Sequence, residues 1–462
     1  MNRALATVLA EAGCSNAALA RGVNELSRVH GEGKRYTKAS VTRWLQGMSP
    51  RDRTPEFVAL VLSGYLERTV GAADLGFAVP GARRVAGRAL AYREDLSATL
   101  GVVSELGAAD LSPRGGVRDA VCVAGALLDP QRQWLLWCAE RGPDAAAEVE
   151  AVAVAELEGV ERVEAVVAAY DEVDNRFGGV GVRSAVVRYL TVEVVPLLRA
   201  CGAGDPSRSR LFTAAAKLTA VAGWSSYDAG LVGLGQRYLV QALRLSAEGG
   251  DRVVGGQVLA GLSHLATEAG APGEGVDLAR AGLASSRGCG SALGVMRLHA
   301  MEARGYAALG RRREATTALR AAETVLEGAA GGEDGARWVR FLDRHYLQAE
   351  AAVCFRDLGV AVEAERMAVG SVLANTERRR RQSISRSVLA SVQLAQGRLD
   401  EALGTAGEAL EQLAGVRSER AVRALEDFRG RLEPHARERA VRDFERRAEA
   451  LTGGPPAARA GR

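Results

Sequence analysis

The sequence predicts an all-α protein, and composition is the first observation that indicates it. Of 462 residues, 47% are apolar but only 5% are aromatic, so most of the apolar residues are Ala, Leu and Val. Pro is scarce, at 12 residues, and the charged fraction is 25%. Small aliphatic residues together with Glu and Arg are good helix formers. The same numbers exclude collagen-like, low-complexity and disulfide-stapled chains.

The second observation is an uneven distribution of charge. The whole chain carries 60 basic and 56 acidic residues, a net charge of +4. Its first 85 residues hold twelve Lys and Arg against seven Asp and Glu, a net charge of +5. A local basic region is the electrostatic signature of a polyanion-binding surface, although solvated charge often produces the same pattern. The excess of positive charge therefore belongs to the N-terminal part.

The first two helices of this part are predicted from apolar faces and caps. Residues 2–12 place Leu5 and Leu9 on one face of a short helix. Ser15 and Asn16 then offer N-cap chemistry for a second helix, because their side-chain oxygens can accept hydrogen bonds from free backbone N–H groups. A Gly-Glu-Gly segment at 31–33 ends that helix.

The third helix is predicted over 38–46, with Thr37 as its N-cap and Gly47 at its end. Its apolar residues point inward and leave a polar outer face of Lys38, Ser40, Thr42 and Arg43. Arg and Lys pair with guanine edges, and Ser and Thr with either base type, so this face suits a DNA major groove. A fourth helix begins at Thr54-Pro55, with Pro in the first helical position.

Phosphate contacts are expected beside the predicted recognition helix. A helix start binds anions, and basic side chains neutralise phosphates. The candidate phosphate-binding residues are Ser15, Asn16, Lys34 and Arg35. The alternative interpretation is a small helical subdomain with a solvated polar face.

Three segments of this region, SNAALARGV, YTKASVTRWLQG and SPRDRTP, resemble the xenobiotic-response-element (lambda-repressor-like) helix-turn-helix family. Thr37 falls at that family's N-cap position, and Arg43 and Gly47 match its usual Arg and terminal Gly. The resemblance implies sequence-specific binding of double-stranded DNA. One departure concerns residues 21–36, which separate the matching segments by more than the family's usual spacing. They predict a longer second helix or a longer turn after it.

The third observation that predicts an all-α fold is a repeat beyond residue 210. A Gly recurs at 230, 270, 310, 359 and 397, and a small residue stands five and twelve positions after each one. Small residues at those places let paired helices approach closely, so a stack of hairpins can bury a continuous core. The alternative is an Ala-rich helical bundle without repeats. The segments at 309–322 and 396–410 resemble degenerate tetratricopeptide repeats, which implies an α-solenoid.

The concave face of such a solenoid binds peptides or proteins. Polar and aromatic residues within the repeats are candidates for that face, although each could equally be ordinary surface. The candidates are Arg237, Tyr238, Gln241, Arg340, Arg344 and Tyr346. The run of four arginines at 378–381 is interpreted as a solvated face, with contact to a phosphate or an acidic partner as the alternative.

No cofactor, metal or catalytic site is predicted. The six Cys and five His are too scattered for metal spacing. The glycines at 178–181 lack the third Gly of a dinucleotide fingerprint. We see no Ser-His-Asp motif and no phosphate-binding loop, and we expect that the chain is not an enzyme. Arg3 and Glu11 interrupt the N-terminal segment, which indicates no signal peptide, and no apolar run is long enough to span a membrane. We therefore expect a cytoplasmic, nucleoid-associated protein.

The order of segments resembles a group of Streptomyces-type actinobacterial regulators, in which a helix-turn-helix precedes a tetratricopeptide-like body. The resemblance is carried by RYTKASVTRWLQGMSPR, GGVGVRSAVVRYLTVEVVPLL, AGWSSYDAGLVGLGQRYLVQALRLS and the repeats. It implies a transcription regulator of development or secondary metabolism. Such a protein would act as a homodimer on two half-sites and respond to a peptide or protein effector. The alternative is a protein-interaction adaptor that does not read DNA.

The predicted division of the chain follows these segments. Residues 1–80 form the helix-turn-helix domain, and 81–208 form a helical connecting region. Residues 209–451 form the repeats, and 452–462 form a C-terminal tail.

Overall fold

The computed structural model describes most of the chain in eleven segments: 2–29, 33–66, 68, 70–72, 74–77, 81–112, 116–141, 154–287, 291–329, 342–373 and 378–452. Within these segments the regular structure is helical throughout, and no strand occurs. The all-α prediction is confirmed. Among the described residues, no helix has both the length and the hydropathy to cross a bilayer. The predicted tail lies, from residue 453 onward, outside the described residues.

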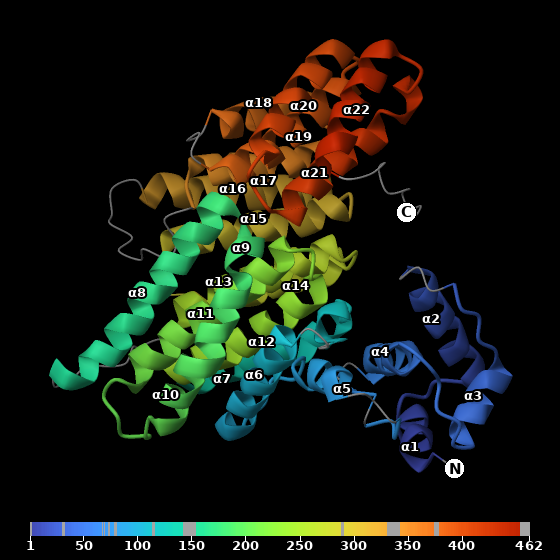
Figure 1. The fold of residues 1–462 in the computed structure, drawn as a ribbon, viewed down its shortest axis with the longest axis vertical. Coiled ribbons are helices and arrows are strands. Elements are labelled where there is room, and N and C mark those ends of the chain that lie inside the picture. The colour runs from blue at the N-terminus through green and yellow to red at the C-terminus, as the bar shows by residue number, and fades with distance from the viewer. Residues whose placement is uncertain are drawn as a thin grey trace.

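Four helices at the N-terminus form a lobe with its own apolar core (Figure 1). They are α1 (Arg3–Glu11), α2 (Asn16–Val29), α3 (Lys38–Leu45) and α4 (Thr54–Leu66). Leu19, Val41 and Phe57 are fully buried where α2, α3 and α4 meet. Each helix begins within a few residues of the predicted position, and Gly47 follows α3 with a φ of 107°, as a helix-ending Gly does.

The middle of the chain contributes a second layer of helices. They are α5 (Gly81–Arg88), α6 (Leu96–Leu111), α7 (Leu128–Arg141), α8 (Val154–Phe177), α9 (Gly179–Tyr189) and α10 (Val195–Ala200). Two 3₁₀ turns, Gly116–Asp119 and Ala124–Leu127, stand between α6 and α7, and a π-helical turn separates α9 from α10. These helices share one apolar core with the first hairpins of the C-terminal part. The described helices of this region are therefore packed against the first hairpins.

Five antiparallel hairpins follow and stack in chain order (Figure 1). They pair α11 (Arg208–Asp228) with α12 (Val232–Gly249), α13 (Arg252–Glu268) with α14 (Pro272–Ser285), α15 (Ala292–Ala308) with α16 (Arg312–Ala329), α17 (Arg344–Asp357) with α18 (Ala361–Val372), and α19 (Arg379–Ala395) with α20 (Leu399–Leu413). The last helices, α21 (Glu419–Arg431) and α22 (Arg439–Thr452), complete the stack. The repeated Gly stands inside each hairpin turn with a φ between 70° and 85°. Only Gly adopts that conformation without strain, which explains the spacing found in the sequence.

The small residues after each repeated Gly lie where two helices touch, as the sequence predicted. A Cβ on Gly275 would stand 3.0 Å from the backbone oxygen of Ser263 in the same hairpin, and one on Gly235 would stand 2.8 Å from that of Gly223. A Cβ on Gly282 would meet Leu298 of the next hairpin. The corresponding residues of later hairpins are also buried, namely Ala315, Ala322, Ala364, Ser371, Ala402 and Ala409. Close approach within and between hairpins therefore depends on these positions.

The two ends of the stack meet each other. Helix α21 contacts α11, and α8 contacts both α11 and α19. The Ser418 hydroxyl donates to Asp228 Oδ1 at 2.7 Å, which joins the start of α21 to the end of α11. The first helices of the hairpins, which contact one another in sequence, therefore surround an inner space that is closed on one side.

Candidate functional site

The outer side of the N-terminal lobe carries the predicted recognition helix. Figure 1 shows α3 at the edge of the lobe farthest from the hairpins. Lys38 and Arg43 on α3 are exposed, as is Arg35 just before it. None of these three charged groups has an ion-pair partner within the part of the chain that the structure describes. The face of α3 is thus basic and uncovered.

Two of the predicted groove residues have structural roles. Ser40 is buried, and its hydroxyl accepts a hydrogen bond from the backbone N–H of Thr37 at 3.2 Å. This contact closes the N-terminus of α3, so the prediction that Ser40 lies on the outer face is wrong. Thr42 is half-buried and donates to the carbonyl oxygen of Lys38 at 3.0 Å. Lys38 and Arg43 remain as the side chains that reach outward.

The predicted phosphate contacts are divided between caps and surface charge. Ser15 caps α2 by accepting from the Ala18 N–H at 3.2 Å, and the Asn16 amide reaches Thr42 Oγ1 at 3.5 Å. Lys34 is tied to Asp52 by an ion pair of 2.5 Å. Of these four residues, only Arg35 is basic, exposed and without an ion-pair partner in the described segments.

The position of α3 is fixed by contacts that the sequence reading did not single out. Asn24 on α2 accepts from the Tyr36 N–H at 2.6 Å and donates to the Tyr36 carbonyl at 2.8 Å. The Tyr36 ring lies edge-on to Trp44 of α3, with 5.2 Å between centroids. The longer spacing noted in the sequence includes a long α2, which extends to Val29 and carries Asn24 beside the segment before α3. The signal in the sequence was a polar residue, Asn24, within the second predicted helix, because an Asn side chain can pair with both the N–H and the C=O of a nearby backbone.

Three of the predicted effector residues are buried under the middle region. Arg237, Tyr238 and Gln241 on α12 are at most 4% exposed. Arg237 donates to the carbonyl oxygens of Ala86 at 2.6 Å and Val121 at 2.8 Å. The prediction that they line an open face is therefore wrong, because described residues of the middle region, Ala86 and Val121 among them, cover α12.

These polar residues instead join the middle region to the hairpins. Gln241 donates to the Ala89 carbonyl at 2.9 Å and Arg244 to the Arg93 carbonyl at 2.7 Å. Arg237, Gln241 and Arg244 lie four and three residues apart, so they share one face of α12. A polar stripe on an otherwise apolar helix is the sequence signal for this contact.

The other three predicted effector residues lie in different places. Arg340 lies outside the described residues. Arg344 is exposed at the start of α17, where it lines a second hollow together with residues of α16 and α18. Tyr346 lines a cavity on the inner side of the stack, and Arg381 lies over its ring at 5.5 Å.

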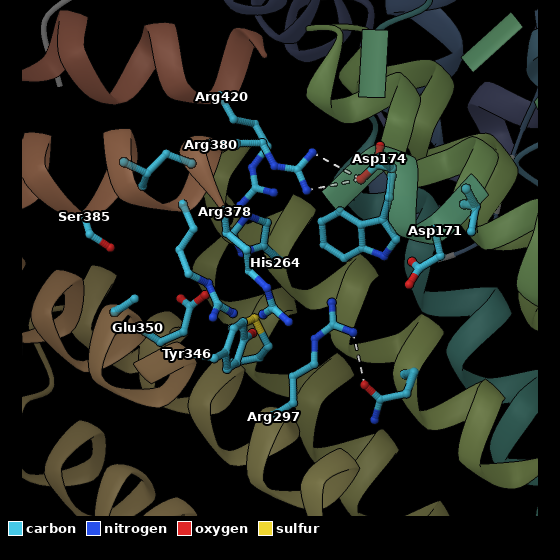
Figure 2. Close-up of a pocket in the computed structure, with 17 residues that line it drawn as sticks. Asp171, Asp174, His264, Arg297, Tyr346, Glu350, Arg378, Arg380, Ser385 and Arg420 are labelled. Atoms are coloured by element: carbon cyan, nitrogen blue, oxygen red, sulfur yellow. Dashed lines mark hydrogen bonds and ion pairs between the residues drawn. The ribbon is translucent and has the colours of Figure 1, made fainter. Parts of the chain in front are cut away.

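That cavity, of about 170 Å³, is built almost entirely from the first helices of the hairpins (Figure 2). We call it the inner cavity. Helices α11, α13, α15, α17, α19 and α21 each contribute side chains, and α8 covers one side. Its polar lining is Asp171, Asp174, Trp224, Gln257, His264, Arg297, Tyr346, Glu350, Arg378, Arg380, Arg381, Ser385 and Arg420. Val221, Met301, Ala349 and Ile384 supply an apolar part.

Three arginines of the run at 378–381, namely Arg378, Arg380 and Arg381, line this cavity. Arg380 is only 12% exposed and pairs with Asp174 of α8 and Asp228 of α11, each at 3.1 Å. Asp228 also accepts from the Gly179 N–H at 2.8 Å, so it fastens the start of α9 to the stack. Burial raises the pKa of Asp228, but Arg380, Arg420 and its hydrogen bonds outweigh burial and lower it. The interpretation of the run as a solvated face is wrong for Arg380 and Arg381, because α8 and α17 cover them.

Asp171 and His264, which both line the inner cavity, have shifted pKa values. Burial, with Asp174 nearby, raises the pKa of Asp171 to about 7, although Arg380 and other arginines oppose the shift. Burial beside Arg304, Arg420 and Arg297 lowers the pKa of His264 well below its usual value. His264 is therefore neutral near pH 7, and its Nε2 shares a hydrogen bond of 3.1 Å with the Tyr227 hydroxyl.

Arginines also lie against aromatic rings at one end of the inner cavity. The Arg297 guanidinium is 5.1 Å from the Trp224 centroid and donates to Gln257 Oε1 at 3.0 Å. Arg420 lies 5.2 Å from the Tyr227 centroid and 5.9 Å from that of Trp224. Such contacts hold cations in place without neutralising them. Among the described residues, no group of three or more His, Cys, Asp or Glu is arranged to hold a metal ion.

Comparison with known families concerns the N-terminal lobe alone. The model of the SP15 N-terminal domain matches residues 5–78, which contain most of α1 and all of α2, α3 and α4. No curated protein matches the chain. The match makes this lobe similar to SP15 N-terminal domains.

Proposed function

We propose that the chain is a DNA-binding transcription regulator whose α3 reads the major groove. The observation that carries the proposal is the uncovered basic face formed by Arg35, Lys38 and Arg43. A helix held rigidly with its polar face outward is what major-groove recognition requires, and Asn24 supplies that rigidity through Tyr36. The resemblance of this lobe to the lambda-repressor-like helix-turn-helix supports the same role.

In this proposal the hairpins bind an effector and form the dimer. Their turn glycines and small contact residues resemble degenerate tetratricopeptide repeats. One recognition helix covers only a few base pairs, so a homodimer on two half-sites would give the specificity that a regulator needs. The resemblance to Streptomyces-type regulators extends the proposal to control of development or secondary metabolism, with the protein acting at the nucleoid.

The test begins with selection of preferred duplexes from a random pool by the full chain. Fluorescence anisotropy then measures the affinity of the Arg43→Ala variant for the selected duplex at fixed salt. We expect a loss of about 1–3 kcal/mol, because a paired guanidinium contributes that much discrimination at one base.

The matched control is Arg313→Ala, which removes an exposed arginine from α16 on the hairpins and should leave the affinity unchanged. Equal affinity of wild type and Arg43→Ala would remove α3 from the interface. Failure of the selection to enrich any sequence would favour the adaptor function instead.

A further inference from the structure

We infer that the inner cavity binds a small organic anion, whose charged group is held by Arg378 and Arg420 and whose apolar part packs on Met301 and Ile384. This names the effector class that the proposed regulator leaves open. Only the effect of the ligand on DNA binding rests on the proposed function. The binding of the ligand is a property of the hairpins.

The partly enclosed shape of the inner cavity favours a small molecule over a peptide. A peptide lying along the hairpins would need an open groove. Here α8 lies against both α11 and α19, and the Arg380–Asp174 ion pair closes that side. The Ser418–Asp228 hydrogen bond closes the end. A peptide would have to break these buried contacts, whereas a small ligand fits within them.

The arginines of the inner cavity are not all neutralised by the protein. Arg380 and Arg381 have carboxylates at hydrogen-bond distance, since Asp343 lies 3.3 Å from Arg381. Arg420 has no ion pair within the described segments and lies over two rings. Arg378 approaches Asp343 only at 3.8 Å, and its buried Nη1 makes no hydrogen bond. Two guanidinium groups thus remain available to an anion (Figure 2).

A buried hydroxyl without a partner points to the same space. Ser385 is 3% exposed and lines the inner cavity, yet its Oγ has no hydrogen bond (Figure 2). The other serines of α19 within the stack, Ser383, Ser387 and Ser391, each donate to a backbone carbonyl. A buried hydroxyl without a hydrogen-bond partner is destabilising, because it has lost its contacts with water and gained none. A ligand oxygen beside Ser385 would remove that destabilisation.

The lining also defines the chemistry of the ligand. Guanidinium groups bind phosphate and carboxylate through paired N–H donors. The apolar side chains Met301, Ile384 and Val221 adjoin these donors and favour a hydrocarbon part on the same molecule. An organic phosphate or carboxylate offers both an anionic group for the guanidinium groups and a hydrocarbon part for the apolar side chains. An inorganic ion offers only the anionic group.

Isothermal titration of the full chain, without DNA, tests the inference. The probes are phenyl phosphate and benzoate, which carry one ring with a different anionic group, and the comparisons are inorganic phosphate and benzyl alcohol. We expect one site for at least one of the two ring anions, and binding at least about tenfold weaker for each comparison compound. The tighter probe identifies a phosphate or a carboxylate ligand. No binding of either probe overturns the inference.

Variants locate the site. Arg420→Met keeps an aliphatic stem over the rings but removes the charge, and it should weaken probe binding at least about tenfold. The control is Arg423→Met, on the same helix but outside the inner cavity. Ser385→Ala provides a second variant that leaves the charges unchanged and should weaken binding more modestly. Unchanged probe affinity in both Arg420→Met and Ser385→Ala would overturn the inference.

The outcome is separable from the proposed DNA function. Probe binding without any preferred DNA sequence would refute the regulator and leave the anion site standing. Specific DNA binding with no probe binding would refute the anion site and leave the proposed regulator standing.

Discussion

At the scale of the residue, side chains that looked alike in the sequence have very different environments. Arg43 and Arg237 are both arginines on predicted helices, yet Arg43 is exposed on α3 and Arg237 is buried against Ala86 and Val121 of the middle region. The spacing of apolar residues along the sequence placed Arg43 correctly, because its apolar neighbours on α3 fill the core of the N-terminal lobe. It failed for Arg237 because the covering segment lies more than a hundred residues away in the chain. Where burial depends on segments so far away in the chain, the spacing of residues in the sequence could not predict it.

Asp171 gives a prediction that belongs to this scale. Its pKa is raised to about 7, so ionisation is harder in the folded chain than in the unfolded one. Its contribution to stability is therefore favourable only while it is protonated, and it is lost as pH rises toward and through about 7. Asp171→Asn should raise the free energy of unfolding by more than about 1 kcal/mol at pH 8, and by less at pH 5.

Chemical denaturation at the two pH values measures this difference. Asp277→Asn, at an exposed position on α14, serves as the control and should show no comparable pH dependence. An Asp171→Asn effect of equal size at pH 5 and pH 8 would contradict the assigned cause.

At the scale of the element, the turn glycines and the small residues after them were the most predictable features. Gly230, Gly270 and Gly310 stand at equal spacing in the sequence, and each has the positive φ that its turn requires. The inner cavity was not predictable in the same way. Its lining comes from seven helices, and the sequence shows neither that α8 covers one side nor that α21 returns to α11.

Two equivalent glycines test the packing of one element. Gly233 and Gly273 are each the second residue of a second hairpin helix, α12 and α14. A Cβ on Gly233 would lie 2.1 Å from the Ala120 carbonyl oxygen, whereas one on Gly273 would meet nothing within 4 Å. Gly233→Ala should therefore destabilise the fold by about 1–3 kcal/mol.

Gly273→Ala should be neutral or slightly stabilising, because Ala favours a helix. Urea unfolding of both variants measures the contrast. Similar stabilities for the two would show that residues 120–123 do not pack on α12 as described.

At the scale of the whole molecule, a basic lobe is joined to a stack of hairpins that encloses the inner cavity on one side. The sequence predicted the two parts from the positions of charge and of small residues. It did not show that the middle region would share a core with the first hairpins, or that α4 would lie against the 3₁₀ turn Ala124–Leu127. These contacts form a continuous path of packed elements from the lobe to α12. A ligand in the inner cavity would change DNA binding only if its affinity differs between two arrangements of that path.

The central claim is that the lobe reads specific DNA. Its most direct test is to sequence the genomic fragments, from the genome that encodes the chain, that the full-length protein retains in solution. The account predicts a limited set of fragments that share a two-part motif, with the enrichment lost in the Lys38→Ala, Arg43→Ala double variant and kept in Arg313→Ala. Retention of fragments without a shared motif, or an unchanged pattern in the double variant, would contradict it.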